Sequence, residues 1–162
     1  MKNGENNFAF IDSNNLNLGV KELGWRLDFK KLRIYLKEKY GITKAYLFIG
    51  YLPKNQELYR SLQEFGYILI FKPVMKNKNG ELKGNVDAEL VLQTMIDWDK
   101  YNKAVIISSD GDFYCLVNYL YEKAKLKRVI SPNYINCSAL LKKAAREKID
   151  FLDYQRNKLA RK

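Results

Sequence analysis

The sequence predicts a single α/β domain with a roughly five-stranded parallel sheet flanked by helices in a doubly wound arrangement. Short apolar runs alternate with stretches in which apolar residues recur at helical spacing, and this alternation is typical of βαβ units. The short runs are almost continuously hydrophobic, as expected of strands that helices cover on both faces. A chain of 162 residues is long enough to bury one core and short for two.

Five short apolar runs are the strand candidates, at residues 8–11, 45–49, 67–71, 104–107 and 128–130. After the first of them, Asp28 is a suitable N-cap for a helix with apolar residues at helical spacing, and Gly41 can close that helix. Further helices are expected after the other strands along the chain. Their ranges are 55–65, 86–97, 113–123 and 139–145, the last with Ser138 as its N-cap.

The remaining segments are expected to be irregular. Residues 13–15 are polar and should open a loop after the first strand. Residues 76–84 are rich in Lys, Asn and Gly without apolar periodicity, which predicts a mobile loop. A flexible N-terminus at 1–7 and a basic C-terminal tail at 153–162 would flank a domain at 8–152. The tail is expected to be either disordered or a short helical extension.

Composition narrows the possible functions. The net charge of +11 favours a phosphate-rich polymer as partner, although lysines that keep the surface soluble explain the same excess. The chain has no histidine, which is the usual acid and base of metal-independent RNA cleavage and the usual zinc ligand, so its chemistry would have to use carboxylates. No apolar run approaches the roughly 20 residues of a spanning helix, and no leader is evident, so we expect a cytoplasmic protein without a membrane partner.

Four acidic residues stand at the ends of predicted strands or at the start of a helix. Asp12 comes directly after the first predicted strand, Asp110 and Asp112 follow the fourth, and Asp87 begins a helix. Active sites of α/β folds form at such places. Each acid taken alone is as well explained as a turn former or a helix cap.

Taken together, these acids predict a metal site. The first and fourth strands of a doubly wound sheet lie side by side, so Asp12 and Asp110 are expected to be neighbours. Carboxylates that share a site repel one another, and a divalent cation relieves this cost. Oxygen ligands without histidine select Mg²⁺ or Mn²⁺ rather than zinc. Glu89 would point about 200° around the helix from Asp87, so we leave it out of the site.

Three motifs carry these acids: FIDSNNL near the start, KGNVDAEL before the mid-chain helix and SSDGDF after the fourth predicted strand. Their combination and order resemble the NYN-domain, LabA-type branch of the PIN-like nucleases, over residues 8–152. The resemblance implies an endoribonuclease that hydrolyses RNA with Mg²⁺ or Mn²⁺ as cofactor. It also implies products with a 5′-phosphate and a 3′-hydroxyl. Base stacking by Tyr51 and Tyr114 would favour single-stranded RNA as the substrate.

The resemblance assigns the catalytic and metal-binding roles to four acids, Asp12, Asp87, Asp110 and Asp112. It places polar residues beside them on the substrate side, namely Asn14, Asn15 and Ser109. A lysine of the loop that leads into the second motif, Lys83, is the candidate for contact with the scissile phosphate.

Two positions depart from the family pattern. Ser109 stands where a glycine is common and Gln93 where many members carry another Asp, which is expected to lower metal affinity. These departures support an alternative, a catalytically weak or inactive RNA-binding module of the same fold. A phosphatase is disfavoured because Asn14 replaces the second Asp that it would need, and a nucleotide cofactor is disfavoured because no glycine-rich loop follows the first strand. Base stacking or plain packing by Tyr51 and Tyr114, and a homodimer, are left open.

Overall fold

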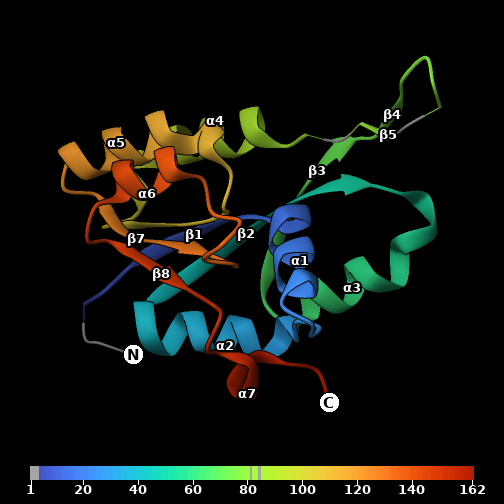
Figure 1. Cartoon of the computed structure of the whole chain (residues 1–162), viewed down its shortest axis with the longest axis horizontal. Coiled ribbons are helices and arrows are strands. Elements are labelled where there is room, and N and C mark those ends of the chain that lie inside the picture. The colour runs from blue at the N-terminus through green and yellow to red at the C-terminus, as the bar shows by residue number, and fades with distance from the viewer. Residues whose placement is uncertain (1–3, 81, 84) are drawn as a thin grey trace.

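A six-stranded parallel sheet lies between two layers of helices in the computed structural model (Figure 1). The model describes residues 4–80, 82–83 and 85–162, and the side chains of 82 and 83 are outside this description. The strand order is β3-β2-β1-β6-β7-β8. Because the order reverses its direction of growth between β1 and β6, the sheet is doubly wound, which confirms the predicted fold class.

All five predicted strands are present, with a sixth at the edge of the sheet. The strands are β1 (Asn7–Asp12), β2 (Ile42–Tyr51), β3 (Tyr67–Pro73), β6 (Ala104–Ile107), β7 (Leu126–Ser131) and β8 (Ile149–Phe151). The prediction of five strands is therefore one short. β8 has only three residues and pairs with β7 alone. This segment is too short to show an apolar run, so the sequence did not predict it.

The helices are α1 (Ser13–Glu22), α2 (Phe29–Tyr40), α3 (Gln56–Glu64), α4 (Asp87–Ile96), α5 (Tyr114–Glu122), α6 (Ala139–Ala145) and α7 (Arg156–Leu159). The expected caps are in place: the carboxylate of Asp28 accepts hydrogen bonds from two backbone N–H groups of α2, and Gly41 ends that helix with φ of 67°. Ser138 caps α6 in the same way. Within the part of the chain that the model describes, no helix is long and apolar enough to cross a membrane.

The predicted loop at 13–15 is wrong, because α1 begins directly after β1. The side chain of Asp12 caps this helix by accepting a hydrogen bond from the N–H of Asn15. Asparagine and glycine disfavour a helix, so local propensity did not indicate one. Burial of Leu16 and Val20 against the sheet stabilises the helix instead.

The segments expected to be irregular contain short regular elements. β4 (Met75–Lys76) and β5 (Leu82–Lys83) pair in antiparallel fashion and form a hairpin that projects from the body (Figure 1). Residues 81 and 84 of the predicted mobile loop lie outside the described residues, as do residues 1–3 of the predicted flexible N-terminus. At the C-terminus α7 forms a short helical extension that buries Leu159.

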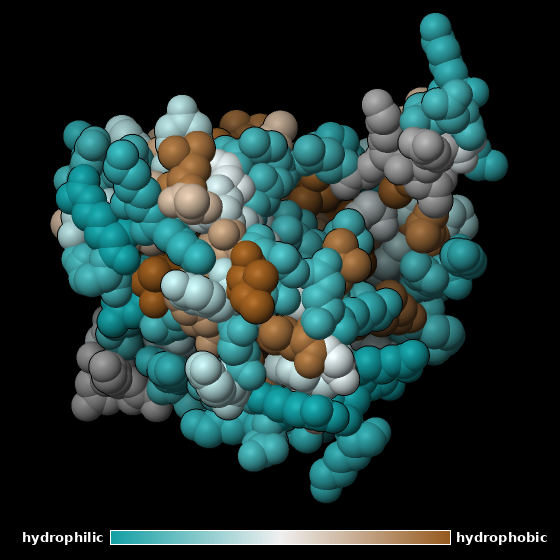
Figure 2. Space-filling model, in the orientation of Figure 1, coloured by the Kyte–Doolittle hydropathy of each residue, from teal (hydrophilic) through white to brown (hydrophobic). Residues whose placement is uncertain are grey.

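Alternate side chains of the strands pack into two separate cores. On one face Phe10, Tyr46 and Ile106 pack with residues of α4, α5 and α6. On the other face Ile11 and Leu47 pack with residues of α1, α2, α3 and α7. Outside these cores, hydrophilic side chains cover most of the face in Figure 2, with scattered hydrophobic patches, in keeping with the strongly charged composition.

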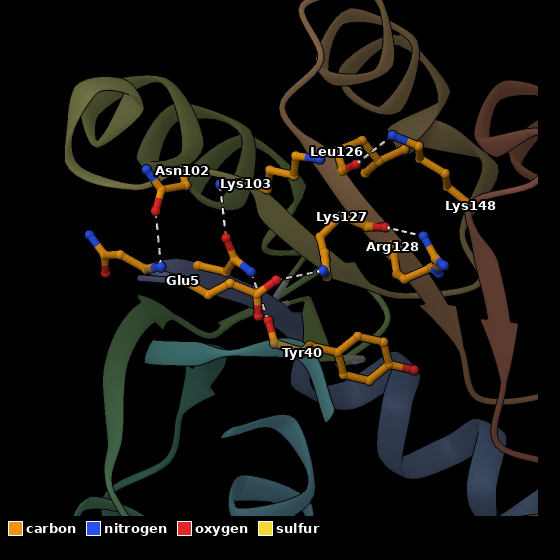
Figure 3. Close-up of polar contacts among 10 residues, drawn as sticks. Glu5, Tyr40, Asn102, Lys103, Leu126, Lys127, Arg128 and Lys148 are labelled. Atoms are coloured by element: carbon orange, nitrogen blue, oxygen red, sulfur yellow. Dashed lines mark hydrogen bonds and ion pairs between the residues drawn. The ribbon is translucent and has the colours of Figure 1, made fainter. Parts of the chain in front are cut away.

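A buried asparagine ties the amino ends of the strands together, at the edge opposite the acidic motifs. Asn7 is 2% exposed, and its Nδ2 donates to the carbonyl of Tyr40 at 2.7 Å. Its Oδ1 accepts from the N–H of Lys103 at 3.1 Å. Lys127 pairs with Glu5 beside it, with 2.9 Å between Nζ and Oε1 (Figure 3). Asn7 therefore links β1 to the end of α2 and to the start of β6.

Replacing Asn7 with alanine is expected to lower the free energy of unfolding by about 2 kcal/mol, because the Tyr40 carbonyl and the Lys103 N–H lose their shared partner in a buried place. Urea unfolding followed by circular dichroism measures the change. Asn102→Ala is the control, since Asn102 is exposed and accepts one hydrogen bond, from the N–H of Asn6. Equal effects of the two substitutions would contradict the role of Asn7.

Candidate metal centre and its cleft

Three of the four predicted acids meet at one edge of the sheet. β1 and β6 are parallel neighbours in register from Phe8 with Ala104 to Ile11 with Ile107, so both strands end at this edge. Asp12 ends β1, Asp110 lies just past β6, and Asp87 begins α4. One carboxylate oxygen from each of the three lies within 4.8 Å of the others. The predicted neighbourhood of Asp12 and Asp110 is therefore present.

Hydrogen bonds hold the most buried of these acids in place. Asp12 is 7% exposed, and its Oδ1 accepts from the N–H of Asn15 at 3.4 Å. Its Oδ2 accepts from the hydroxyl of Ser108 at 3.3 Å. The Ser108 oxygen in turn accepts from the N–H of Asp110 at 3.1 Å. Ser108 thus connects the ends of β1 and β6, a positioning role that the sequence analysis did not assign.

Burial and crowding of like charges make the site unfavourable for three ionised carboxylates. Burial raises the pKa of Asp12 to about 6, with further upward shifts from the charges of Asp87 and Asp110. The pKa of Asp87 is also raised, first by burial and then by the charges of Asp110 and Asp112. A divalent cation would remove this repulsion, and carboxylate oxygens are the ligands that hard cations prefer. The residues present therefore fit Mg²⁺ or Mn²⁺.

The fourth predicted acid stands apart from this group. Asp112 is exposed, and its backbone N–H donates to Oδ1 of Asp110 at 2.9 Å. Its carboxylate is not one of the three that approach within 4.8 Å. Asp112 nevertheless lies close enough for its charge to affect Asp87.

The predicted substrate residues divide into two kinds. The side-chain oxygen of Asn15 accepts from the N–H and the hydroxyl of Ser109, at 2.9 and 3.0 Å, so these two residues hold each other. Asn14 is exposed and lines the cleft next to the acids. The backbone of Lys83 pairs with Met75 in the hairpin, but its side chain lies outside the described residues.

The other residues singled out from the sequence have partners outside the group of three acids. Gln93 lies beside Tyr46 and Asp97 near the far end of α4. Glu89 pairs with Lys72, with 3.4 Å between Oε1 and Nζ. The ring of Tyr51 stacks on that of Tyr59, with 5.8 Å between the ring centroids, so Tyr51 packs within the protein in this structure. Tyr114 lines a smaller cavity beside α5 and α6.

The three acids line one wall of a cleft of about 940 Å³. Its other walls come from α1, α3, the end of β2 and the C-terminal segment. Three cationic side chains that were not among the site residues assigned from the sequence also line it: Lys21, Arg26 and Arg161. The helical spacing of Asn14 and Lys21 could have indicated the first of them, had α1 been predicted. Arg161 reaches the cleft only through tertiary packing.

Fold and site together define an α/β domain of the doubly wound type with a carboxylate cluster at the carboxyl edge of its parallel sheet. The NYN domain model matches residues 8–152. The chain therefore belongs to the NYN domain family, a member of the PIN-like nuclease superfamily, which supports a nuclease or RNA-related role.

The chain is similar to two known proteins. The chain is 27% identical over 132 residues to the low amplitude and bright protein LabA of Synechococcus elongatus, covering 75% of this chain and 71% of LabA. The crystal structure of a protein of unknown function from Vibrio parahaemolyticus superimposes with a TM-score of 0.78 at 18% identity. Its likeness covers 98% of both chains and shows the same fold.

Proposed function

We propose that this protein is a metal-dependent endoribonuclease that hydrolyses phosphodiester bonds in RNA, with single-stranded RNA favoured. The observation that supports the proposal most is the meeting of Asp12, Asp87 and Asp110 in the wall of a large cleft. Membership of a PIN-like family and the net charge of +11 agree with a phosphate-rich substrate.

In this proposal the four acids bind the cation in two ways. Asp12 and Asp110 hold the cation directly, and Asp87 and Asp112 hold it directly or through water. A bound Mg²⁺ or Mn²⁺ supplies Lewis acidity toward a phosphate oxygen and lowers the pKa of its bound water. Ser108 keeps Asp12 oriented through the hydroxyl that it donates to Oδ2. Whichever of Asp87 and Asp112 held the cation through water would accept the proton of the attacking water.

A second candidate function is RNA binding without efficient cleavage. The observation in its favour is that Asp112 lies outside the group of three close carboxylates. Against it, the Gln93 departure lies near Tyr46 and Asp97 rather than beside the acids. We therefore keep the nuclease as the conclusion.

Cleavage of an end-labelled single-stranded RNA tests the proposal directly. Purified protein is incubated with Mn²⁺ or Mg²⁺, with EDTA, and as the Asp110→Asn variant. Asp99→Asn is the matched control, because Asp99 is an exposed acid that does not line the cleft. We expect metal-dependent cutting that Asp99→Asn retains, and a loss of roughly 10³-fold in Asp110→Asn.

Cleavage that persists in EDTA or in Asp110→Asn would refute the metal site. RNA that stays intact but binds in a salt-sensitive manner would establish the binding module instead.

A further inference from the structure

One face of α1 runs along the cleft from its acidic end to its basic end. Asn14, Asn17, Leu18 and Lys21 all line the cleft and recur at spacings of three, four and seven residues, so they share one helix face. Asp12 lies just before this face, at the N-terminal end of the helix. Seven residues at 1.5 Å each place Lys21 roughly 10 Å along the axis from Asn14. A single phosphate group cannot contact both ends of the cleft.

The C-terminal segment supplies the far wall of the cleft. The N–H of Arg161 donates to the carbonyl of Arg26 at 2.9 Å. Leu27 and Ala160 form an antiparallel bridge, and the N–H of Asp28 donates to the carbonyl of Leu159 at 2.8 Å. Leu159 itself is fully buried. These bonds hold Arg161 next to Arg26, although this segment lies beyond residues 8–152 that match the family model.

The three cations at this end have no acidic partner among the described residues. Lys21, Arg26 and Arg161 are exposed, and none of the ion pairs in the described part of the chain uses them. Each is thus available for an anion without first breaking an ion pair. Three such side chains in the lining of one cleft produce a positive potential there, and Lys21 contributes to it about 10 Å along α1 from Asn14.

Apolar side chains also line the cleft. Leu18 is 53% exposed and Leu58 is 46% exposed, and Phe29 and Leu52 lie along the same cleft. Apolar surface of this kind can accept the face of a base or a sugar, whereas a purely ionic ligand would leave it bare.

We propose that Lys21, Arg26 and Arg161 form a phosphate subsite that holds a single-stranded RNA at a phosphate beyond the scissile one. The strand would lie along α1, with one phosphate at the acids and another at the basic end. This inference rests on the proposed function, since it names how the same cleft holds its RNA. Arg161 is a substrate-binding residue in this arrangement, and the C-terminal segment is part of the RNA site.

Binding measured without cleavage tests the subsite. The Asp110→Asn protein is titrated into a fluorescein-labelled single-stranded RNA, and fluorescence anisotropy is read at several salt concentrations in EDTA. Adding Arg161→Ala is expected to weaken binding about tenfold, the effect of losing one hydrogen bond to a charged group. The slope of log K against log salt should become shallower by about 0.7, as for one lost phosphate contact on a single strand.

Lys162→Ala is the matched control, because Lys162 is the neighbouring exposed cation and does not line the cleft. It should leave affinity and slope nearly unchanged. Arg161→Lys should keep the slope of log K against log salt and recover part of the affinity, since it keeps the charge but loses the guanidinium fork. Thermal unfolding of each variant shows whether the C-terminal segment stays attached.

The outcomes separate this inference from the proposed function. Equal weakening by Arg161→Ala and Lys162→Ala, or no weakening by either, overturns the subsite even where the wild-type protein cuts RNA. Conversely, selective weakening by Arg161→Ala supports the subsite even where no cutting is seen. Absence of RNA binding at low salt overturns the subsite as well.

Discussion

The Asp12→Asn variant is expected to lose RNA cleavage by roughly 10³-fold while its metal-free form becomes more stable than the wild-type protein. Asparagine has the size of aspartate and still caps α1, but it brings no charge into a buried site beside Asp87 and Asp110. Activity and stability should thus move in opposite directions, as they do where an active site stores unfavourable charge.

The direction of the Asp12 pKa shift determines how the stability of the protein depends on pH. The pKa of Asp12 is raised from 3.8 to about 6 in the folded protein, so folding disfavours its ionised form. The wild-type protein therefore loses stability as the pH rises from about 4 to 6, and the penalty is fully present above that range. A shift of this size corresponds to a gain on the order of 3 kcal/mol for Asp12→Asn at pH 7.5, which disappears near pH 4.

Urea unfolding in EDTA at pH 4 and pH 7.5 measures this difference. Asp28→Asn is the control, because Asp28 caps α2 in the same way but stands outside the acidic group. We expect its stability to change by no more than about 0.5 kcal/mol, with cleavage unchanged. Adding Mn²⁺ should stabilise the wild-type protein much more than Asp12→Asn. A variant less stable than wild type at pH 7.5 would contradict the charge argument.

Gly111→Ala is expected to reduce cleavage about 10²-fold, because the added Cβ would move the Asp110 turn. That Cβ would lie 2.4 Å from Oγ and 3.0 Å from Cβ of Ser138, closer than atoms pack. Ser138 cannot simply turn away, since its hydroxyl caps α6 and its N–H donates to the carbonyl of Ser109 at 3.1 Å. The clash should also cost about 1 to 2 kcal/mol of stability.

A double-mutant cycle with Ser138→Gly isolates the cause. Ser138→Gly removes both clashing atoms, and glycine is tolerated at a helix N-cap at a cost of a few tenths of a kcal/mol. The Gly111→Ala, Ser138→Gly protein should therefore be more active and more stable than Gly111→Ala alone. Strict additivity of the two substitutions would show that contact with Ser138 is not the reason that Gly111 is required.

Local sequence was sufficient for the elements whose signals lie within a few residues. Asp28 and Gly41 bound α2, and Ser138 begins α6, because caps satisfy backbone groups one to three residues away. Five apolar runs likewise predicted five strands, because the hydrophobicity of a strand covered on both faces is visible within a few consecutive residues. The meeting of Asp12 and Asp110 followed from a topological rule, since β1 and β6 flank the point where the strand order reverses.

Tertiary structure alone decided what depends on contacts between distant residues. α1 contradicts its local propensity and forms because Leu16 and Val20 are buried, and β8 exists only as a partner of β7. Asp112 follows the same strand as Asp110 yet stays outside the close group, and Arg161 joins Arg26 across nearly the whole chain. The sequence by itself determined the fold class, the family and the neighbourhood of Asp12 and Asp110. Tertiary packing formed the cleft and brought its basic residues together. Burial and long-range hydrogen bonds place these side chains, and no local sequence pattern predicts their positions.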